Sequence, residues 1–445
     1  MRILADINNK EMKQKFLILI IACLIINKTK AQLSKQEKDN VIDSAIALMN
    51  KAYIFPDIAQ NTVAYIRNQQ KNKVYDTIND VNAFANKLTA DFVKICHDKH
   101  VRIFYSADII PYRQLNKLMS IPDEEKAGYN EFLKHMNYGI TKIDVLSGNI
   151  GYIDFNFLCG TEFAGDVYTA MMNYLAHTEA LIIDLRNCGG SFSPNAVPFL
   201  CSYFFANPTH LKDTHYKDSS DFEQAWTYAY VPGAKYTDKP IYILVSNKTF
   251  SGAEEMAYDL KALKRATIIG QQTGGGANPG GELRLTAHFG MFIPVAQVTN
   301  PITKTNWEGV GITPDSICST KLALYTAQLM SMKNSLAKTK DQNWKNGLQQ
   351  WITDLENNPP QLKQIVFTLK GFDNAKDVFV TGSFNDWNAS DTKLEYKNGE
   401  WTATVTAEPG EIMYKFIVDG NYILDPANTD KKTENGYDNS VKIVK

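Results

Sequence analysis

The sequence has no excess of charge of either sign. Lysine and arginine together number 47, aspartate and glutamate number 48, and the 445-residue chain has a formal net charge of -1. Nucleic acids and anionic surfaces attract proteins that carry a clear basic patch or a basic excess. We therefore expect no nucleic-acid partner.

Long hydrophobic runs are also missing. A helix needs about 20 apolar residues to span a bilayer, and the run from Phe16 to Ile26 is shorter. Lysines precede this run, and a polar step and a small residue follow it, which is the pattern of a secretory signal. We predict a signal peptide over residues 1–31, with its start at Met12 and cleavage near Ala31.

Such a signal implies an exported protein, whether periplasmic, secreted or at the cell surface. The segment "IIAC" offers the alternative of lipid anchoring on Cys23. Cleavage near Ala31 is favoured over this alternative, because the apolar run continues past the cysteine.

Cysteine is scarce, and five cysteines remain after the predicted cleavage. They are Cys96, Cys159, Cys188, Cys201 and Cys318. Their spacing fits no zinc site, and an odd number in a chain of this length forms no disulfide framework. The glycine-rich segment "GQQTGGGANPGG" has no phosphate-loop lysine, which argues against nucleotide binding. We predict buried thiols, no metal and no cofactor.

The hydrophobic pattern changes period along the chain. Residues 34–95 show helical spacing, with Val81, Phe84, Leu88 and Phe92 on one face behind the capping residue Asp80. Short apolar runs such as "ALIIDL" and "PIYILVS" then alternate with helical stretches, which predicts an α/β core. After "NPP" the period becomes two, with Asn-Gly, Pro-Gly and Asp-Gly turns, which predicts a small β-sandwich.

These changes of pattern suggest domain boundaries. The predicted parts are an N-terminal helical domain over 32–135, a core over 136–325, a helical linker over 326–360 and a sandwich over 361–445.

Ser251 stands at the junction between an apolar strand and a helix, in "NKTFSGAEEMAYDLKAL". The unpaired N–H groups of a helix N-terminus stabilise negative charge, and Gly252 lets the backbone approach closely, so the position suits a nucleophile. The alternative is an ordinary N-cap serine, which is common. Glu254 and Glu255 lie in the first turn, where carboxylates favourably meet the helix dipole, and we assign them no catalytic role.

Other segments supply partners for a nucleophile. The run "ALIIDLRNCGG" ends in Gly189 and Gly190, either of which could provide a second oxyanion donor. Glu308 precedes a glycine-rich turn in "NWEGVGITPD". It is either an acidic partner in catalysis or a cap for that turn.

The ordered blocks "DKHVRIFY", "LIIDLRNCGG", "TFSGAEEMAYDLKALKRATIIGQQTGGGA" and "NPITKTNWEGVGITPD" resemble the tail-specific serine peptidase family, in the branch of the interphotoreceptor retinoid-binding protein repeats. The resemblance covers roughly Ser34 to Leu324. It implies a crotonase-like or Clp-protease-like α/β core behind a helical bundle, and a polypeptide substrate.

The resemblance also assigns roles. It implies Ser251 as nucleophile, His100 as general base and Glu308 as the acidic residue, with oxyanion donors from Gly252 and from Gly189 or Gly190. The catalytic lysine and the inserted PDZ domain of the carboxy-terminal processing branch are missing, which points to histidine as the base. Cys188 stands where relatives commonly carry asparagine, so the second oxyanion loop departs from the family pattern.

The C-terminal segments "DVFVTGSFNDWN" and "IMYKFIVDGNYILDPAN" resemble the glycogen-binding module of the AMP-activated kinase β-subunit, an immunoglobulin-like fold. The sugar-binding positions that this resemblance implies are Trp387, Tyr422, Lys415 and Asn439. An α-glucan is then a second partner. The alternative is a spacer or docking domain.

Three functions stay open on the sequence alone. The first is a serine endopeptidase that works through an acyl-enzyme. The second is a carrier of apolar ligands such as retinoids or fatty acids, as the resemblance to retinoid-binding repeats implies. The third is a surface protein anchored to glucan, whose core serves as a scaffold.

Overall fold

The structure, a computed structural model, describes residues 33–115, 121–217, 222–385, 387–389, 391–434 and 437–445. The chain divides into two compact units. The first comprises Met1–Leu118 with Gly281–Pro294, and the second comprises Met119–Gly280 with Val295–Lys445. The predicted signal peptide and Cys23 lie outside the described residues.

The first unit contains the predicted N-terminal helices. They are α2 (Lys35–Ala52), α3 (Pro56–Lys71) and α4 (Val81–Cys96). The Asp80 carboxylate accepts the N–H groups of Asn82 and Ala83, which satisfies two of the unpaired donors at the start of α4. Phe84, Leu88 and Phe92 of the predicted apolar face are buried. The helical period therefore identified the packing side of α4 correctly.

A three-stranded sheet completes the first unit. Its order is β1 (Arg102–Tyr105), β10 (Phe289–Pro294) and β9 (Gly280–Arg284), and β1 pairs antiparallel with β10. The hairpin of β9 and β10 comes from far along the chain, within the range predicted for the core. The short loop between α4 and β1 carries His100.

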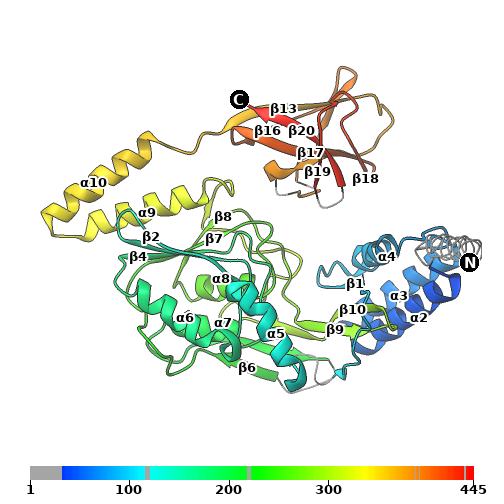
Figure 1. The fold of residues 1–445 in the computed structure, drawn as a ribbon, viewed down its shortest axis with the longest axis horizontal. Helices are drawn as coiled ribbons and strands as arrows, with labels where there is room; N and C mark the ends of the chain where they lie inside the picture. Colours follow the sequence, from blue (N-terminus) through cyan, green and yellow to red (C-terminus); the bar gives the residue numbers. More distant parts are fainter. Residues whose placement is uncertain (1–32, 116–120, 218–221, 386, 390, 435–436) are drawn as a thin grey trace, which may run out of the picture. The chain divides into compact units, whose positions relative to one another are not determined.

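The second unit is built on a six-stranded sheet with the order β12-β8-β7-β4-β3-β2 (Figure 1). The strands are β2 (Ile140–Leu146), β3 (Ile150–Phe155), β4 (Ala180–Asp184), β7 (Ile241–Val245), β8 (Thr267–Gly270) and β12 (Ser316–Ile317). All neighbours pair in parallel except β2 with β3. Every residue of β4 and of β7 is buried, as expected for continuous apolar strands covered on both faces.

Helices cover both faces of this sheet. On one face α6 (Thr161–Leu175), α7 (Ala196–Ser202) and α8 (Gly252–Ala262) share an apolar cluster with side chains such as Ile183 and Ile243. On the other face α9 (Ala323–Lys338) and α10 (Gln342–Asn357) pack against neighbours such as Ile182 and Leu244. The alternation of helices and parallel strands confirms the predicted α/β class.

Smaller elements flank the main sheet. They are α5 (Asp123–His135), η2 (Asn137–Gly139) and a sheet of β11 (Ala296–Thr299), β5 (His210–Tyr216) and β6 (Phe222–Trp226). Because parallel strands point the same way, the loops after β4, β7 and β8 emerge at one edge of the main sheet. Ligand sites in open α/β sheets lie at this edge.

The C-terminal region forms two antiparallel sheets. One has the order β13 (Lys363–Lys370), β16 (Glu400–Ala407) and β15 (Glu395–Lys397). The other is made of β14 (Val378–Gly382), β17 (Gly410–Val418), β20 (Tyr437–Val444) and β19 (Lys431–Glu434), with β18 (Asn421–Ile423) paired to β17, and η3 (Ser383–Asn385) follows β14. Alternate residues of β17, including Tyr414 and Phe416, join side chains of the other sheet in one apolar core. This is the period of two that the sequence shows.

None of the helices in the described part of the chain combines the length and the apolar character needed to cross a membrane.

Candidate active site

Ser251 occupies a sharp junction between β7 and α8. Its backbone has φ 52° and ψ -123°, whereas an ordinary N-cap residue has extended angles. A non-glycine residue at positive φ costs on the order of 1–3 kcal/mol and is found most often at functional sites. The geometry therefore differs from that of a simple capping serine.

Two glycines bring the loop after β4 close to the Ser251–Gly252 backbone. A side chain added at Gly190 would place its Cβ 3.0 Å from the Ser251 Cβ. One added at Gly252 would place its Cβ 2.7 Å from the Cβ and 3.0 Å from the backbone nitrogen of Ser191. The Gly190–Ser191 and Ser251–Gly252 backbones are thus in contact, and only glycine fits at the two positions.

The two predicted second donors differ in the structure. Gly189 donates its N–H to the Asn156 carbonyl at 3.1 Å, so this group is already used within the fold. Gly190 has φ 134° and lies beside the nitrogen of Gly252. Of the two, Gly190 is the better placed to provide the second oxyanion donor.

Cys188 is part of the support for this loop. Its carbonyl accepts the N–H of Phe250 at 3.1 Å, and its thiol is buried. Burial raises the pKa of the thiol to about 12. A thiol with this pKa is protonated near neutral pH, which argues against Cys188 as an alternative nucleophile. Within the described residues all five cysteines are free. Four are buried, as predicted, whereas Cys318 is only partly buried.

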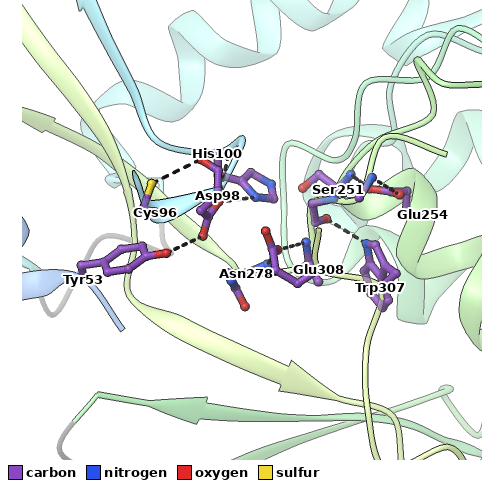
Figure 2. Close-up of polar contacts among 12 residues, drawn as sticks. Tyr53, Cys96, Asp98, His100, Ser251, Glu254, Asn278, Trp307 and Glu308 are labelled. Atoms are coloured by element: carbon purple, nitrogen blue, oxygen red, sulfur yellow. Dashed lines mark hydrogen bonds and ion pairs between the residues drawn. The ribbon is translucent and has the colours of Figure 1, made fainter. Parts of the chain in front are cut away.

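Glu254 is fully buried in the first turn of α8 (Figure 2). One carboxylate oxygen, Oε2, accepts the N–H of Ser251 at 3.0 Å and of Gly276 at 2.8 Å. The other oxygen, Oε1, accepts the N–H of Gly275 at 2.7 Å and the hydroxyl of Thr273 at 2.5 Å. Burial raises the pKa of Glu254 above its ordinary value, and these hydrogen bonds oppose that shift.

Our sequence interpretation of Glu254 was incomplete, because it considered the helix dipole alone. The signal that could have found it is the spacing Ser-x-x-Glu at a helix start, in which the glutamate accepts the N–H of the capping residue.

Glu308 holds the next part of the same glycine-rich loop. Its Oε2 accepts the N–H of Ala277 at 2.6 Å and of Asn278 at 3.1 Å. The indole of Trp307 donates to the Gly276 carbonyl at 2.8 Å. Two carboxylates therefore bind four consecutive N–H groups of the loop, residues 275–278 (Figure 2).

His100 belongs to the first unit. Its Nδ1 lies 3.7 Å from Oδ1 of Asp98, which is buried, and the His100 N–H donates to the same oxygen at 3.0 Å. The imidazole stacks on Phe292 with ring centroids 5.7 Å apart. Tyr53 donates its hydroxyl to the other oxygen of Asp98 at 3.3 Å. Asp98, which our sequence interpretation did not single out, therefore supports the loop that carries His100.

A second buried polar cluster lies further along α8. Lys212 pairs with Glu255 at 2.6 Å, and Asn300 donates to the buried Asp259 at 3.0 Å. Burial, and next the charge of Glu255, raise the pKa of Asp259 well above its ordinary value. Asp259 therefore holds a proton more tightly in the folded protein than in the unfolded chain.

This shift predicts a pH-dependent stability. A carboxyl group with a raised folded-state pKa stabilises the fold fully below its unfolded pKa of about 3.9, and this contribution is lost as pH rises through the folded pKa. Asp259→Asn cannot ionise. The free energy of unfolding of Asp259→Asn, relative to that of the wild type, should therefore increase with pH, by at most about 1.4 kcal/mol per pH unit.

Urea unfolding between pH 5 and pH 8 measures this difference. The exposed Asp354 on α10 provides the matched control, Asp354→Asn. A difference between Asp259→Asn and the wild type that stays constant from pH 5 to pH 8 would contradict the prediction.

The four positions predicted to bind sugar lie in the second C-terminal sheet and its loops. Tyr422 is 58% exposed on β18, and Lys415 on β17 places its Nζ 5.5 Å from the ring centroid of Tyr437. Trp387 follows β14 with φ 61° and donates its N–H to the Gly382 carbonyl. Asn439 is only 5% exposed, and its side chain donates to the Tyr437 carbonyl at 3.2 Å.

Three segments of the chain match known protein families. Residues 149–318 match peptidase family S41, and residues 29–146 match the N-terminal domain of this family in eukaryotic IRBP. Residues 364–445 match the glycogen recognition site of AMP-activated protein kinase.

Among curated proteins, the 5'-AMP-activated protein kinase subunit beta-1 of Bos taurus is 36% identical over 98 residues, which make up 21% of this chain and 35% of the subunit. The chloroplastic protein PTST homolog 2 of Arabidopsis thaliana is 34% identical over 71 residues, 16% of this chain and 13% of that protein. The chain thus spans about a third or less of the length of these relatives.

Among solved structures, a lipoprotein from Streptococcus agalactiae is 16% identical, covering 67% of this chain and 96% of its own, with a TM-score of 0.45. The photosystem II D1 C-terminal processing protease is 15% identical, covering 65% and 95%, with a TM-score of 0.39. These scores are low, so the assignment rests on the sequence families. On that basis residues 29–318 belong to peptidase family S41, and residues 364–445 match the glycogen recognition site of AMP-activated protein kinase.

Proposed function

We propose that the protein is an exported serine endopeptidase that cleaves polypeptides through an acyl-enzyme on Ser251. The observation that carries the proposal is the backbone of Ser251, which is held at positive φ at the start of α8, with Gly190 packed against it and the next residue, Gly252, packed against Ser191. A strained serine at a strand-to-helix junction is the arrangement that presents a hydroxyl for attack. Membership in peptidase family S41 agrees with this chemistry.

The reaction follows from the roles that the sequence predicts. The Ser251 Oγ attacks the carbonyl carbon of the peptide bond while His100 takes the hydroxyl proton. The N–H groups of Gly252 and Gly190 stabilise the oxyanion. The C–N bond then breaks, and His100 returns the proton to the amine. Water hydrolyses the resulting ester by the same steps, and Glu308 is the acidic residue that favours the charged imidazole.

The proposal is tested by incubating purified residues 32–445 with casein. A peptidase should convert casein to smaller fragments over time, as seen on a gel. Intact casein, combined with saturable quenching of the protein's fluorescence by retinol or a fatty acid, would favour the carrier of apolar ligands instead.

A second activity is proposed for the C-terminal module, which is binding of an α-glucan. The match to the glycogen recognition site supports it, and so do Tyr422, which is exposed, and Lys415, whose ammonium group lies over the ring of Tyr437. Aromatic rings offer flat apolar surface on which sugar rings can stack. The affinity should be weak, because few side chains contribute and binding must overcome the lost freedom of the ligand.

We expect amylose in a native gel to retard residues 32–445, and Trp387→Ala to remove the retardation. Tyr396, an exposed tyrosine on β15 in the other sheet, gives a matched control, and Tyr396→Ala should migrate as the wild type does. Equal migration of the wild type with and without amylose would leave the module as a spacer or a docking domain.

A further inference from the structure

Glu254 connects two parts of the candidate site that are distant in sequence. Its carboxylate receives four hydrogen bonds, from Ser251, Thr273, Gly275 and Gly276. The first donor is the backbone of the proposed nucleophile, and the others belong to the loop after β8. The side chain is fully buried, so this arrangement is shielded from water.

This degree of burial needs an explanation. A carboxylate removed from water loses its hydration, and the cost is offset only where hydrogen bonds replace it. Here both oxygens are occupied, and three of the donors are backbone N–H groups, whose positions are fixed by the chain. Charge-assisted bonds of this kind are about twice as strong as neutral ones. The carboxylate therefore restrains the backbones that it joins.

The restraint acts where the backbone is strained. Ser251 is held at φ 52°, and Gly275 at φ 80°. Each conformation persists only if its surroundings determine it. Glu254 contacts the N–H of both residues, and Gly309 in turn donates its N–H to the Gly275 carbonyl at 3.0 Å.

We propose that Glu254 is a positioning residue, which keeps the Ser251 backbone in its reactive conformation by tying it to the loop of residues 273–276. This inference rests on the proposed function of Ser251 as nucleophile. Glu254 itself touches no reacting atom, and its effect is on the placement of the Ser251 hydroxyl and of the Gly252 N–H next to it.

The variant Glu254→Gln tests the inference with almost no change in volume. In one amide orientation its NH2 group faces the N–H groups of Ser251 and Gly276, and in the other it faces the N–H of Gly275. Either orientation leaves at least one backbone donor without its acceptor. A misplacement of about 1 Å at a reacting group can cost about a hundredfold in rate.

Glu255→Gln is the matched control. Glu255 is the adjacent residue on α8 and is also buried, but it pairs with Lys212 and not with the loop. Its substitution should lower the melting temperature without changing the chemistry at Ser251.

The measurement is the rate of labelling by a fluorophosphonate, taken for each variant well below its melting temperature. We expect Glu254→Gln to react about a hundredfold more slowly than the wild type, and Glu255→Gln to stay within about threefold of it. Hydrogen exchange of the amides of residues 273–276 should also become faster in Glu254→Gln alone. If Glu254→Gln fails to fold, Thr273→Ala removes one donor to Glu254, together with the acceptor of the Ile312 N–H, and should show the same changes, reduced in size.

A labelling rate of Glu254→Gln within about threefold of the wild type would overturn the inference, as would unchanged amide exchange. A wild-type protein that does not react would contradict the proposed nucleophile instead. Amide exchange would then still decide whether Glu254 holds the loop.

Discussion

Replacing Ser251 with alanine should reduce casein hydrolysis by at least about a thousandfold, because an acyl-enzyme cannot form without the hydroxyl. Alanine keeps the Cβ that packs near Gly190, so the substitution removes the oxygen and little else. The initial rate of peptide release, measured with wild type and variant at equal concentration, checks this result.

The fold must remain intact for that result to count. The far-ultraviolet circular dichroism and the melting temperature of Ser251→Ala should match those of the wild type. Hydrolysis at the wild-type rate in a correctly folded variant would exclude Ser251 from the mechanism.

His100→Ala should cause a loss of similar size, and the double variant with Ser251→Ala should be no worse than either single variant. Residues that act as one unit in a reaction are strongly non-additive, whereas independent contributions multiply. A rate for His100→Ala within about tenfold of the wild type, or about 1.4 kcal/mol of barrier, would show that another base acts.

His97 supplies the control for this experiment. It ends α4 with φ 57°, a left-handed conformation that asparagine also adopts. His97→Asn should therefore keep the wild-type rate.

Local patterns in the sequence were sufficient for much of the fold. The period of 3.6 residues and the cap at Asp80 identified α4, because both act within a few turns of one helix. The apolar runs of β4 and β7, which alternate with helical stretches, indicated an α/β core, and both strands are fully buried. The sequence also showed that the glycine pair follows the carboxyl end of the first of these strands and that Ser251 follows the carboxyl end of the second.

The contacts within the candidate site could not be predicted from such local patterns. Both Gly189 and Gly190 suit an oxyanion donor by residue type, and only the fold shows that the Gly189 N–H is used by Asn156. Glu308 precedes a turn in the sequence, yet its carboxylate binds the N–H groups of Ala277 and Asn278. These partners are set by where the loops after β8 and β11 meet.

The sequence by itself determined the α/β class, the helical N-terminal region, the period-two C-terminal region and the position of Ser251 at a strand-to-helix junction. Each of these depends on residues close together in the chain, whose spacing is set by local geometry. Only the tertiary structure decided that Glu254 joins Ser251 to residues 273–276 and that the hairpin of β9 and β10 folds with the N-terminal helices. Such contacts join segments that are far apart in the sequence. They depend on packing and on hydrogen bonds to buried polar groups, so no local sequence pattern predicts them.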